Sequence, residues 1–213
     1  AIAAAEPRAW IATPRAQLLR FISRAVRRIP ISVVAGGPWP LSRLERPDDG
    51  RPPVEVTADD HALVTFTTGS TGRPKAAARS HGFLWAQHLA LAEHMALTPD
   101  DVDMPTLPVF VLNNLAMGVT SVIPDFDPRR PADIHAPTVL RNMREERVTT
   151  LGASPAFCEA LIAECRRTAR PLALRRLFTG GAPVLPPLAR ALAQWVTGRA
   201  EVLYGSTEAE PIA

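Results

Sequence analysis

Glycines, hydroxyl-bearing residues and one lysine directly follow an apolar, β-branched segment at residues 62–67. The candidate ligand-binding residues of this loop are Thr67, Thr68, Gly69, Ser70, Thr71, Gly72 and Lys75. Glycines let the backbone approach a ligand closely, while amides and hydroxyls can donate to phosphate oxygens. Lys75, the only lysine in the chain, adds a compact positive charge. We therefore predict a triphosphate-binding loop.

The spacing of this loop differs from that of a P-loop, in which glycine and lysine are followed at once by serine or threonine. Here Arg73 and Pro74 separate Gly72 from Lys75, and Ala76 comes next. A P-loop phosphotransferase is therefore disfavoured, and another kind of nucleotide-binding protein is the better interpretation.

Two further loops also follow apolar segments directly. The first comprises Gly180, Gly181, Ala182 and Pro183. Its small residues could expose backbone to a flat ring such as adenine, although a plain strand-to-helix turn would look the same. The second comprises Tyr204, Gly205, Thr207 and Glu208. There a tyrosine can stack on a base, a threonine can bond a phosphate and a glutamate can hold Mg²⁺ through oxygen.

The segments around these loops alternate between strand and helix patterns. Strands are predicted at residues 31–34, 62–67, 119–123, 148–152, 177–179 and 201–204, and a strand followed by a turn at residues 103–108. Helices are predicted at residues 7–28, 80–95, 109–117, 136–146, 154 onward and 185–195. This alternation is typical of an α/β fold with largely parallel sheets flanked by helices. Ligands of such folds bind beyond the carboxyl ends of the strands, so we expect the three loops to face one site.

The three loops, in this order, resemble the motifs of the adenylate-forming superfamily, which includes acyl-CoA synthetases, luciferases and peptide-synthetase adenylation domains. The resemblance covers essentially the whole chain. It implies that the loop ending at Lys75 binds the phosphates of ATP and that residues 180–183 contact adenine. It also implies that Thr207 meets the AMP phosphate and that Glu208 is the magnesium ligand. Lys75, Thr207 and Glu208 are thereby the expected catalytic residues.

A narrower resemblance, at residues 105–110 and 120–132, is to the β-lactone synthetases of bacterial olefin biosynthesis. That branch adenylates a β-hydroxy acid, whose hydroxyl then closes the ring. The implied activity is ATP-dependent activation of a carboxylic acid, fatty or β-hydroxy fatty, as an acyl-adenylate with release of pyrophosphate. Transfer to a thiol such as coenzyme A, or closure to a β-lactone, would follow. A non-catalytic nucleotide-binding module of the same fold is the alternative.

The chain departs from the family pattern in two ways. Residues 109–112 hold no histidine, whereas many acyl-CoA synthetases carry one shortly after the proline at this motif. The family's C-terminal lysine has no counterpart either, because Lys75 is the only lysine. We therefore expect residues 1–213 to be part of an N-terminal adenylation domain whose C-terminal lid domain is absent from this chain. We also expect the isolated chain to be inactive.

Composition narrows the expected partners. The net charge is +3, and the densest arginine cluster, Arg24, Arg27 and Arg28, is interpreted as the solvated face of a helix. Aromatic residues do not interleave with a basic stripe, so nucleic-acid binding is not expected. No apolar run approaches the roughly 20 residues that cross a bilayer. The sequence thus predicts a cytoplasmic protein. The resemblance implies that its partner is a carboxylic acid, and the oligomeric state stays open.

Other candidate side chains are assigned structural roles or left open. Cys158 and Cys165 lie about 10 Å apart along a predicted helix, which is too far for a disulfide. Ser154 fits a helix N-cap better than a hydrolase nucleophile. The histidines at 81, 88 and 94 lack the partners that a metal site needs. Three apolar residues could line an acyl pocket or fill the core: Phe110, Leu112 and Met117.

Overall fold

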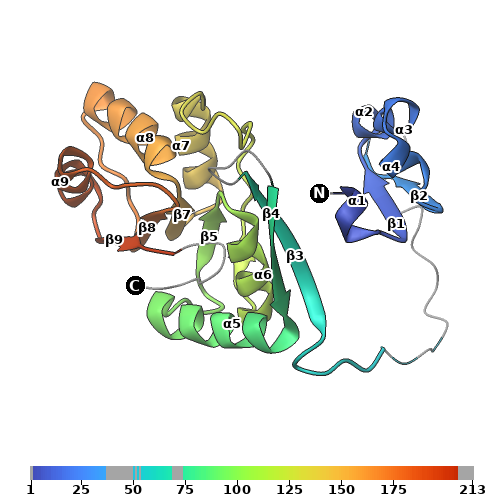
Figure 1. The fold of residues 1–213 in the computed structure, drawn as a ribbon. Helices are drawn as coiled ribbons and strands as arrows, with labels where there is room; N and C mark the ends of the chain where they lie inside the picture. The colour runs from blue at the N-terminus through green and yellow to red at the C-terminus, as the bar shows by residue number, and fades with distance from the viewer. Residues whose placement is uncertain (1, 37–49, 51, 53, 69–73, 206–213) are drawn as a thin grey trace. The chain divides into compact units, whose positions relative to one another are not determined.

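The computed structural model describes residues 2–36, 50, 52, 54–68 and 74–205 (Figure 1). The chain divides into two compact units, Ala1–His81 and Gly82–Ala213. None of the helices in the described part of the chain is long and apolar enough to cross a membrane.

The first unit begins with short elements. They are α1 (Ile2–Ala5), β1 (Ala9–Ala12), α2 (Pro14–Gln17), α3 (Leu19–Ile22), α4 (Arg24–Arg27) and β2 (Ile31–Val34). The single helix predicted over residues 7–28 is therefore wrong. β1 is extended because it pairs in parallel with β2. Thr13 and Ser23 then interrupt the helical pattern, since the hydroxyl of each accepts a backbone N–H bond and starts a new helix. The predicted strand at residues 31–34 is confirmed.

A long hairpin completes the first unit. Strand β3 (His61–Thr68) confirms the strand predicted at residues 62–67, and β4 (Pro74–Ser80) pairs with it in antiparallel register. β4 was not predicted from the sequence, because Ala76–Ala78 favour a helix by propensity and only their pairing with β3 makes them extended. The segment that carries Lys75 is thus a β-hairpin instead of a strand-to-helix turn. Gly69, Ser70, Thr71 and Gly72 lie outside the described residues.

The second unit contains a five-stranded sheet in which every pair is parallel. Its strands are β5 (Val102–Pro105), β6 (Thr120–Ser121), β7 (Thr150–Ala153), β8 (Arg176–Gly180) and β9 (Arg199–Leu203). The strand order is β6-β5-β7-β8-β9. The α/β class with a parallel sheet flanked by helices is therefore confirmed. The strand predicted over residues 119–123 shortens to the two residues of the edge strand β6.

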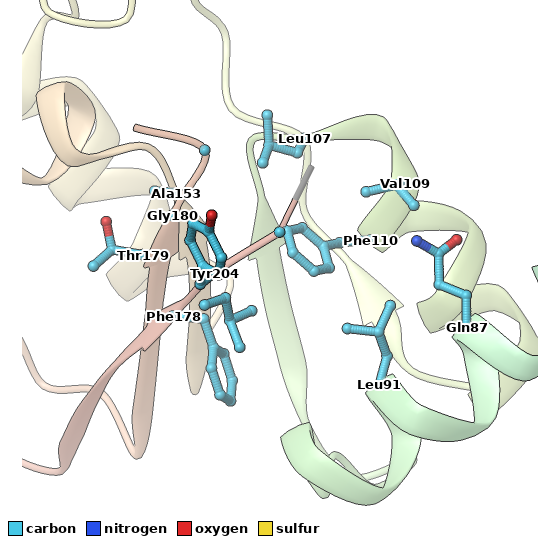
Figure 2. Close-up of a pocket in the computed structure, with 13 residues that line it drawn as sticks. Gln87, Leu91, Leu107, Val109, Phe110, Ala153, Phe178, Thr179, Gly180 and Tyr204 are labelled. Atoms are coloured by element: carbon cyan, nitrogen blue, oxygen red, sulfur yellow. The ribbon is translucent and has the colours of Figure 1, made fainter. Parts of the chain in front are cut away.

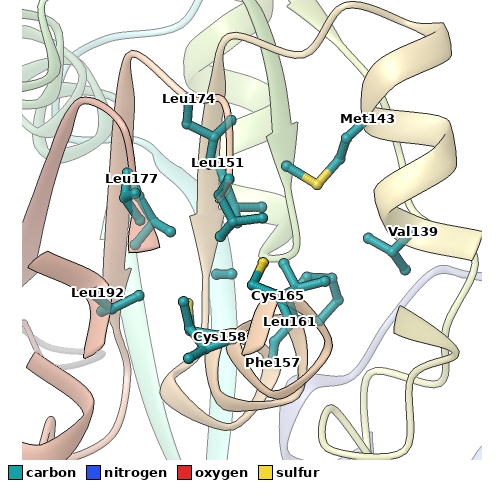
Figure 3. Packing of buried hydrophobic residues seen from close by; sticks show 14 of the residues in the cluster. Val139, Met143, Leu151, Phe157, Cys158, Leu161, Cys165, Leu174, Leu177 and Leu192 are labelled. Carbon is teal, nitrogen blue, oxygen red and sulfur yellow. The ribbon is translucent and has the colours of Figure 1, made fainter. Parts of the chain in front are cut away.

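Helices cover both faces of this sheet (Figure 1). They are α5 (His81–Met95), α6 (Pro108–Met117), α7 (Ala136–Glu145), α8 (Pro155–Thr168) and α9 (Pro186–Trp195), all close to their predicted positions. Successive strand residues point to opposite faces, so Leu177 packs with α7, α8 and α9, whereas Phe178 packs with α5 and α6. Figure 3 shows the first of these cores, in which Leu151 and Leu177 contact the helices.

Two sequence predictions about α8 are confirmed by its packing. The Ser154 hydroxyl accepts the backbone N–H of Phe157 at 3.4 Å, so this serine is the N-cap of the helix. Cys158 and Cys165 are free thiols buried in the core under the sheet. Burial raises the pKa of the Cys158 thiol to about 11 and also raises that of Cys165. Both thiols are therefore neutral and unreactive at ordinary pH.

Candidate functional site

A pocket opens where β8 and β9 end and the helices α5 and α6 lie across from them (Figure 2). One wall consists of Thr179, Gly180 and Gly181 from the end of β8, with Leu203, Tyr204 and Gly205 from the end of β9. This is the carboxyl end of a parallel sheet, where α/β folds bind their ligands. The pocket joins two of the three loops that the sequence singled out, since Gly180, Gly181, Tyr204 and Gly205 all line it.

Gly180 is required by the close approach of two strands at this wall. A β-carbon added at Gly180 would overlap the carbonyl oxygen of Leu203, its register partner on β9. Gly181 has a φ of +79°, a left-handed conformation that favours glycine. Ala182 and Pro183 follow as exposed residues at the turn before α9. The turn therefore presents bare backbone next to Tyr204, a residue that is 64% exposed.

The opposite wall of the pocket comes from helices and is largely apolar. It includes Gln87 and Leu91 of α5 together with Leu107, Val109 and Phe110 at the start of α6. Figure 2 shows Gln87, Leu91 and Val109 on this side, facing Thr179, Gly180 and Tyr204 across the ring of Phe110. The pocket thus has a glycine-rich wall that suits a planar ring and an apolar wall that suits a hydrocarbon.

The structure gives different positions to the three apolar residues whose roles the sequence did not decide. Phe110 takes both roles, since it lines the pocket and belongs to the core between the sheet and α5. It rests on Gly152 of β7, where an added β-carbon would meet the ring at 3.5 Å. Met117 packs against the same core, while Leu112 is 59% exposed.

Gln87 and Thr179 are pocket residues that the sequence analysis missed. Gln87 is only 6% exposed although its neighbours on the apolar wall are hydrocarbon side chains. It lies four and eight residues before Leu91 and Met95, both buried, so the three share one face of α5. This i, i+4, i+8 pattern is readable in the sequence, but the pocket that it faces is not.

The first predicted loop lies in the other unit. Lys75 is exposed on β4 and pairs across the hairpin with Thr67, next to the pairing of Thr68 with Pro74. Thr67, Thr68 and Lys75 are therefore neighbours at the end of the hairpin. Thr207 and Glu208, like Gly69–Gly72, lie outside the described residues.

Charged side chains cluster near the amino ends of the strands, away from the ends that form the pocket. Arg175 donates two hydrogen bonds to the Asp101 carboxylate, at 3.0 Å from Nε and 2.6 Å from a terminal nitrogen. Burial by itself raises the pKa of Asp101, but hydrogen bonds from the Thr98 backbone, Thr149 and Arg175 outweigh it and hold the pKa below its usual value. On β8, Arg176 similarly binds Glu201 at 2.7 Å. These groups tie strands together.

Asp103 differs from Asp101 because its carboxyl group is completely buried within the sheet. It accepts hydrogen bonds from Thr150 Oγ1 at 2.6 Å and from Asn114 Nδ2 at 2.8 Å. Burial nevertheless dominates and raises the pKa of Asp103. The group joins β5, β7 and α6, so its role is structural.

Two histidines of α5 contact polar groups of neighbouring elements. His88 Nδ1 lies 2.9 Å from the side-chain oxygen of Asn113, and His94 Nε2 lies 3.7 Å from Glu201. Among the described residues, no group of three or more potential metal ligands comes together.

Comparison with known proteins identifies the family. The model of the family described as "AMP-binding enzyme" matches residues 1–213, so the chain belongs to the AMP-binding enzyme family. Among curated proteins, it is 36% identical over 219 residues to an olefin β-lactone synthetase of Xanthomonas campestris pv. campestris. It is 35% identical over 187 residues to a feruloyl-CoA synthase of Amycolatopsis sp..

These matches cover most of this chain but a smaller part of each relative. They span 98% and 81% of the chain, yet only 39% of the β-lactone synthetase and 35% of the feruloyl-CoA synthase. The fold is similar to that of the N-terminal domain of FACL13 from Mycobacterium tuberculosis, with a TM-score of 0.78 and 23% identity over 97% of this chain and 52% of that one. A long-chain-fatty-acid-CoA ligase from Archaeoglobus fulgidus gives a TM-score of 0.74 with 23% identity, covering 99% and 45%.

Proposed function

We propose that the chain forms the nucleotide- and acid-binding part of a ligase that activates a carboxylic acid with ATP. The carboxylate would attack the α-phosphorus of ATP, form an acyl-adenylate and displace pyrophosphate. The observation that carries the proposal is the two-walled pocket at the carboxyl ends of β8 and β9, in a chain that belongs to the AMP-binding family. A planar base and an acyl chain are the two ligand parts that these walls suit.

The part of the proposal that concerns the adenine base rests on the glycine-rich wall of the pocket. At Gly180 the strands leave no space for a side chain, so an approaching ring would meet backbone. Tyr204 offers a largely exposed aromatic face beside it. We assign residues 180–183 to the adenine and Tyr204 to stacking on the base.

The part of the proposal that concerns the phosphates rests on the β3–β4 hairpin. Lys75 and Thr67 are paired at the point where the two strands approach the glycine- and hydroxyl-rich segment. We assign residues 67–72 and Lys75 to the β- and γ-phosphates, where amides, hydroxyls and one ammonium group would bind the anionic oxygens.

The remaining assigned residues follow from the likeness to the family. Thr207 would hold the AMP phosphate, and Glu208 would hold Mg²⁺, a cation that prefers carboxylate oxygen. When bound, the metal would neutralise charge that develops on the departing pyrophosphate. The chain's own contribution is to hold the reacting groups in position and to stabilise that charge.

The fate of the acyl-adenylate is the finer part of the proposal. The β-lactone synthetase and the feruloyl-CoA synthase have nearly the same identity to this chain, 36% and 35%, over 98% and 81% of it. The acyl group would therefore pass to a thiol such as coenzyme A or close on its own β-hydroxyl. Only the second path needs a hydroxyl on the substrate.

Product analysis tests this function. The protein at its full natural length is incubated with ATP, Mg²⁺ and either a fatty acid or its β-hydroxy counterpart, with and without coenzyme A. Release of AMP and pyrophosphate supports the proposal, and the requirement for coenzyme A or the loss of water from the product identifies the second step. Formation of ADP would indicate a phosphotransferase, and the absence of any acid-dependent nucleotide product would indicate a non-catalytic module.

A further inference from the structure

The short helices of the first unit bury some of their apolar side chains and expose others. Val26 of α4 and Ile29, which follows it, are buried. Leu18, Phe21 and Ile22 are instead 60%, 76% and 80% exposed. Leu18 joins α2 to α3 with helical backbone angles, so these three residues, spaced three and four apart, share one side of a helical turn. A helix face that only meets water would carry polar side chains there.

The same segment is strongly basic. Residues 14–28 contain five arginines and no acidic residue, whereas the whole chain has a net charge of only +3. Four of these arginines are exposed: Arg15, Arg24, Arg27 and Arg28. The positive charge of the chain is therefore concentrated on these helices, and the remainder of the chain is slightly acidic.

The basic and the apolar side chains lie next to one another. The guanidinium group of Arg27 donates to the backbone carbonyl oxygen of Phe21 at 2.6 Å and to that of Arg20 at 3.1 Å, which fixes it at the end of α3. Arg15 precedes Leu18 by three residues and is therefore its neighbour on the helix surface. Hydrocarbon and positive charge are thus presented together on α2, α3 and α4, which are grouped beside β1 and β2 (Figure 1).

We propose that residues 14–28 form a docking surface for an anionic lipid bilayer. Phe21 and Ile22 would enter the boundary between headgroups and hydrocarbon, while the arginines would contact lipid phosphates. Helices of four residues are too short to span a bilayer, so the contact would be peripheral. A nucleic acid would offer phosphates to the arginines but no hydrocarbon to Phe21 and Ile22. This inference is independent of the proposed acid activation.

The test measures how the protein at its full natural length binds to sedimented lipid vesicles, in the absence of ATP and acid. One set of vesicles is an equimolar mixture of phosphatidylglycerol and phosphatidylcholine, and the other is phosphatidylcholine alone. The wild type is expected to bind the mixed vesicles at least about tenfold more tightly than the neutral ones. High salt should remove much of this preference, because it screens the arginine charges.

Two variants separate the apolar contribution from the charged one. Phe21→Ser combined with Ile22→Ser should weaken binding to the mixed vesicles at least about tenfold, because the hydrocarbon that enters the bilayer is lost. Arg24→Gln should weaken the same binding about fivefold. The three positions are exposed, so the stability of both variants should stay close to that of the wild type.

Matched control variants lie in the second unit. Leu115 is 70% exposed on α6, a helix without charged residues, and Arg190 is exposed on α9. Leu115→Ser and Arg190→Gln remove the same kinds of side chain from a different place, so both proteins should bind the mixed vesicles as the wild type does.

Three results would overturn the proposal. The first is equal binding of the wild type to both kinds of vesicle. The second is undiminished binding after Phe21→Ser and Ile22→Ser, which would mean that charge alone acts. The third is a lack of binding to either vesicle, as expected if another part of the protein covers these helices or if double-stranded DNA is bound in place of lipid.

Discussion

At the scale of single residues, Gly180 is the position where the smallest change should have a large effect. An added methyl group would collide with the backbone of Leu203, so β9 would have to move and carry Tyr204 with it. We expect Gly180→Ala to lower the free energy of unfolding by about 1–3 kcal/mol and to weaken nucleotide binding. Urea denaturation and equilibrium binding of an acyl-adenylate analogue measure the two effects.

Gly152→Ala is the matched control for that substitution. Its added β-carbon would meet the Phe110 ring at 3.5 Å, an ordinary van der Waals contact. The control should therefore cost less stability than Gly180→Ala. Equal losses in the two variants would contradict the close approach of β8 and β9 as the cause.

Asp103 should make the stability of the protein depend on pH. Because burial raises its pKa, the folded protein keeps this proton to a higher pH than the unfolded chain does. Stability is therefore lost as the pH rises from the usual aspartate pKa through the raised one. Asp103→Asn is always neutral, so its stability relative to the wild type should increase with pH, by about 1.4 kcal/mol for each unit of the shift.

Urea denaturation of the two proteins at about pH 4 and about pH 7 measures this difference. For Asp101→Asn, the stability relative to the wild type should change with pH in the opposite direction. The pKa of Asp101 is lowered, so the stability that its carboxylate contributes is present above the usual pKa and is lost as the pH falls. If the difference between Asp103→Asn and the wild type were the same at both pH values, burial would not control this carboxyl group.

At the scale of elements, helix α8 begins after Ser154, whose capping role can be tested by a single substitution. The Ser154 hydroxyl accepts the Phe157 N–H, so Ser154→Ala should cost about 1 kcal/mol of stability by leaving that donor without its cap. Ser154→Asp should retain most of the stability, since aspartate is also a good N-cap and its charge suits a helix amino end. Chemical denaturation compares the three proteins, and equal stability of Ser154→Ala and the wild type would refute the capping role.

Elements specified by local signals could be predicted from the sequence, and those specified by pairing with another strand could not. Ser154 and Pro155 mark the start of α8, and the prediction there is confirmed. β1 and β4 were missed because their strands are defined by pairing with β2 and β3, and nothing in Ala9–Ala12 or Pro74–Ser80 alone requires an extended backbone. Such strand pairing overrides local helix propensity.

At the scale of the whole molecule, the sequence predicted part of the candidate site. Chain order and strand–loop spacing placed Gly180 and Tyr204 at the same edge of a parallel sheet, and the structure brings both into one pocket. Gln87 could not be predicted as a pocket residue, because it lies about a hundred residues before that edge and reaches it only through the packing of α5. The roles assigned to Lys75 and Glu208 stay predictions.

The central claim, as proposed above, is that a protein in which this chain forms the nucleotide- and acid-binding part activates an acid as its adenylate, with Lys75 binding the phosphates. The most direct measurement is acid-dependent ATP–pyrophosphate exchange by the protein at its full natural length, compared with Lys75→Ala and with the charge-retaining Lys75→Arg. We predict exchange in the wild type, a loss of about 100-fold in Lys75→Ala and a smaller loss in Lys75→Arg, all at unchanged stability. The claim would be contradicted if exchange did not depend on the acid, or if Lys75→Ala exchanged as fast as the wild type.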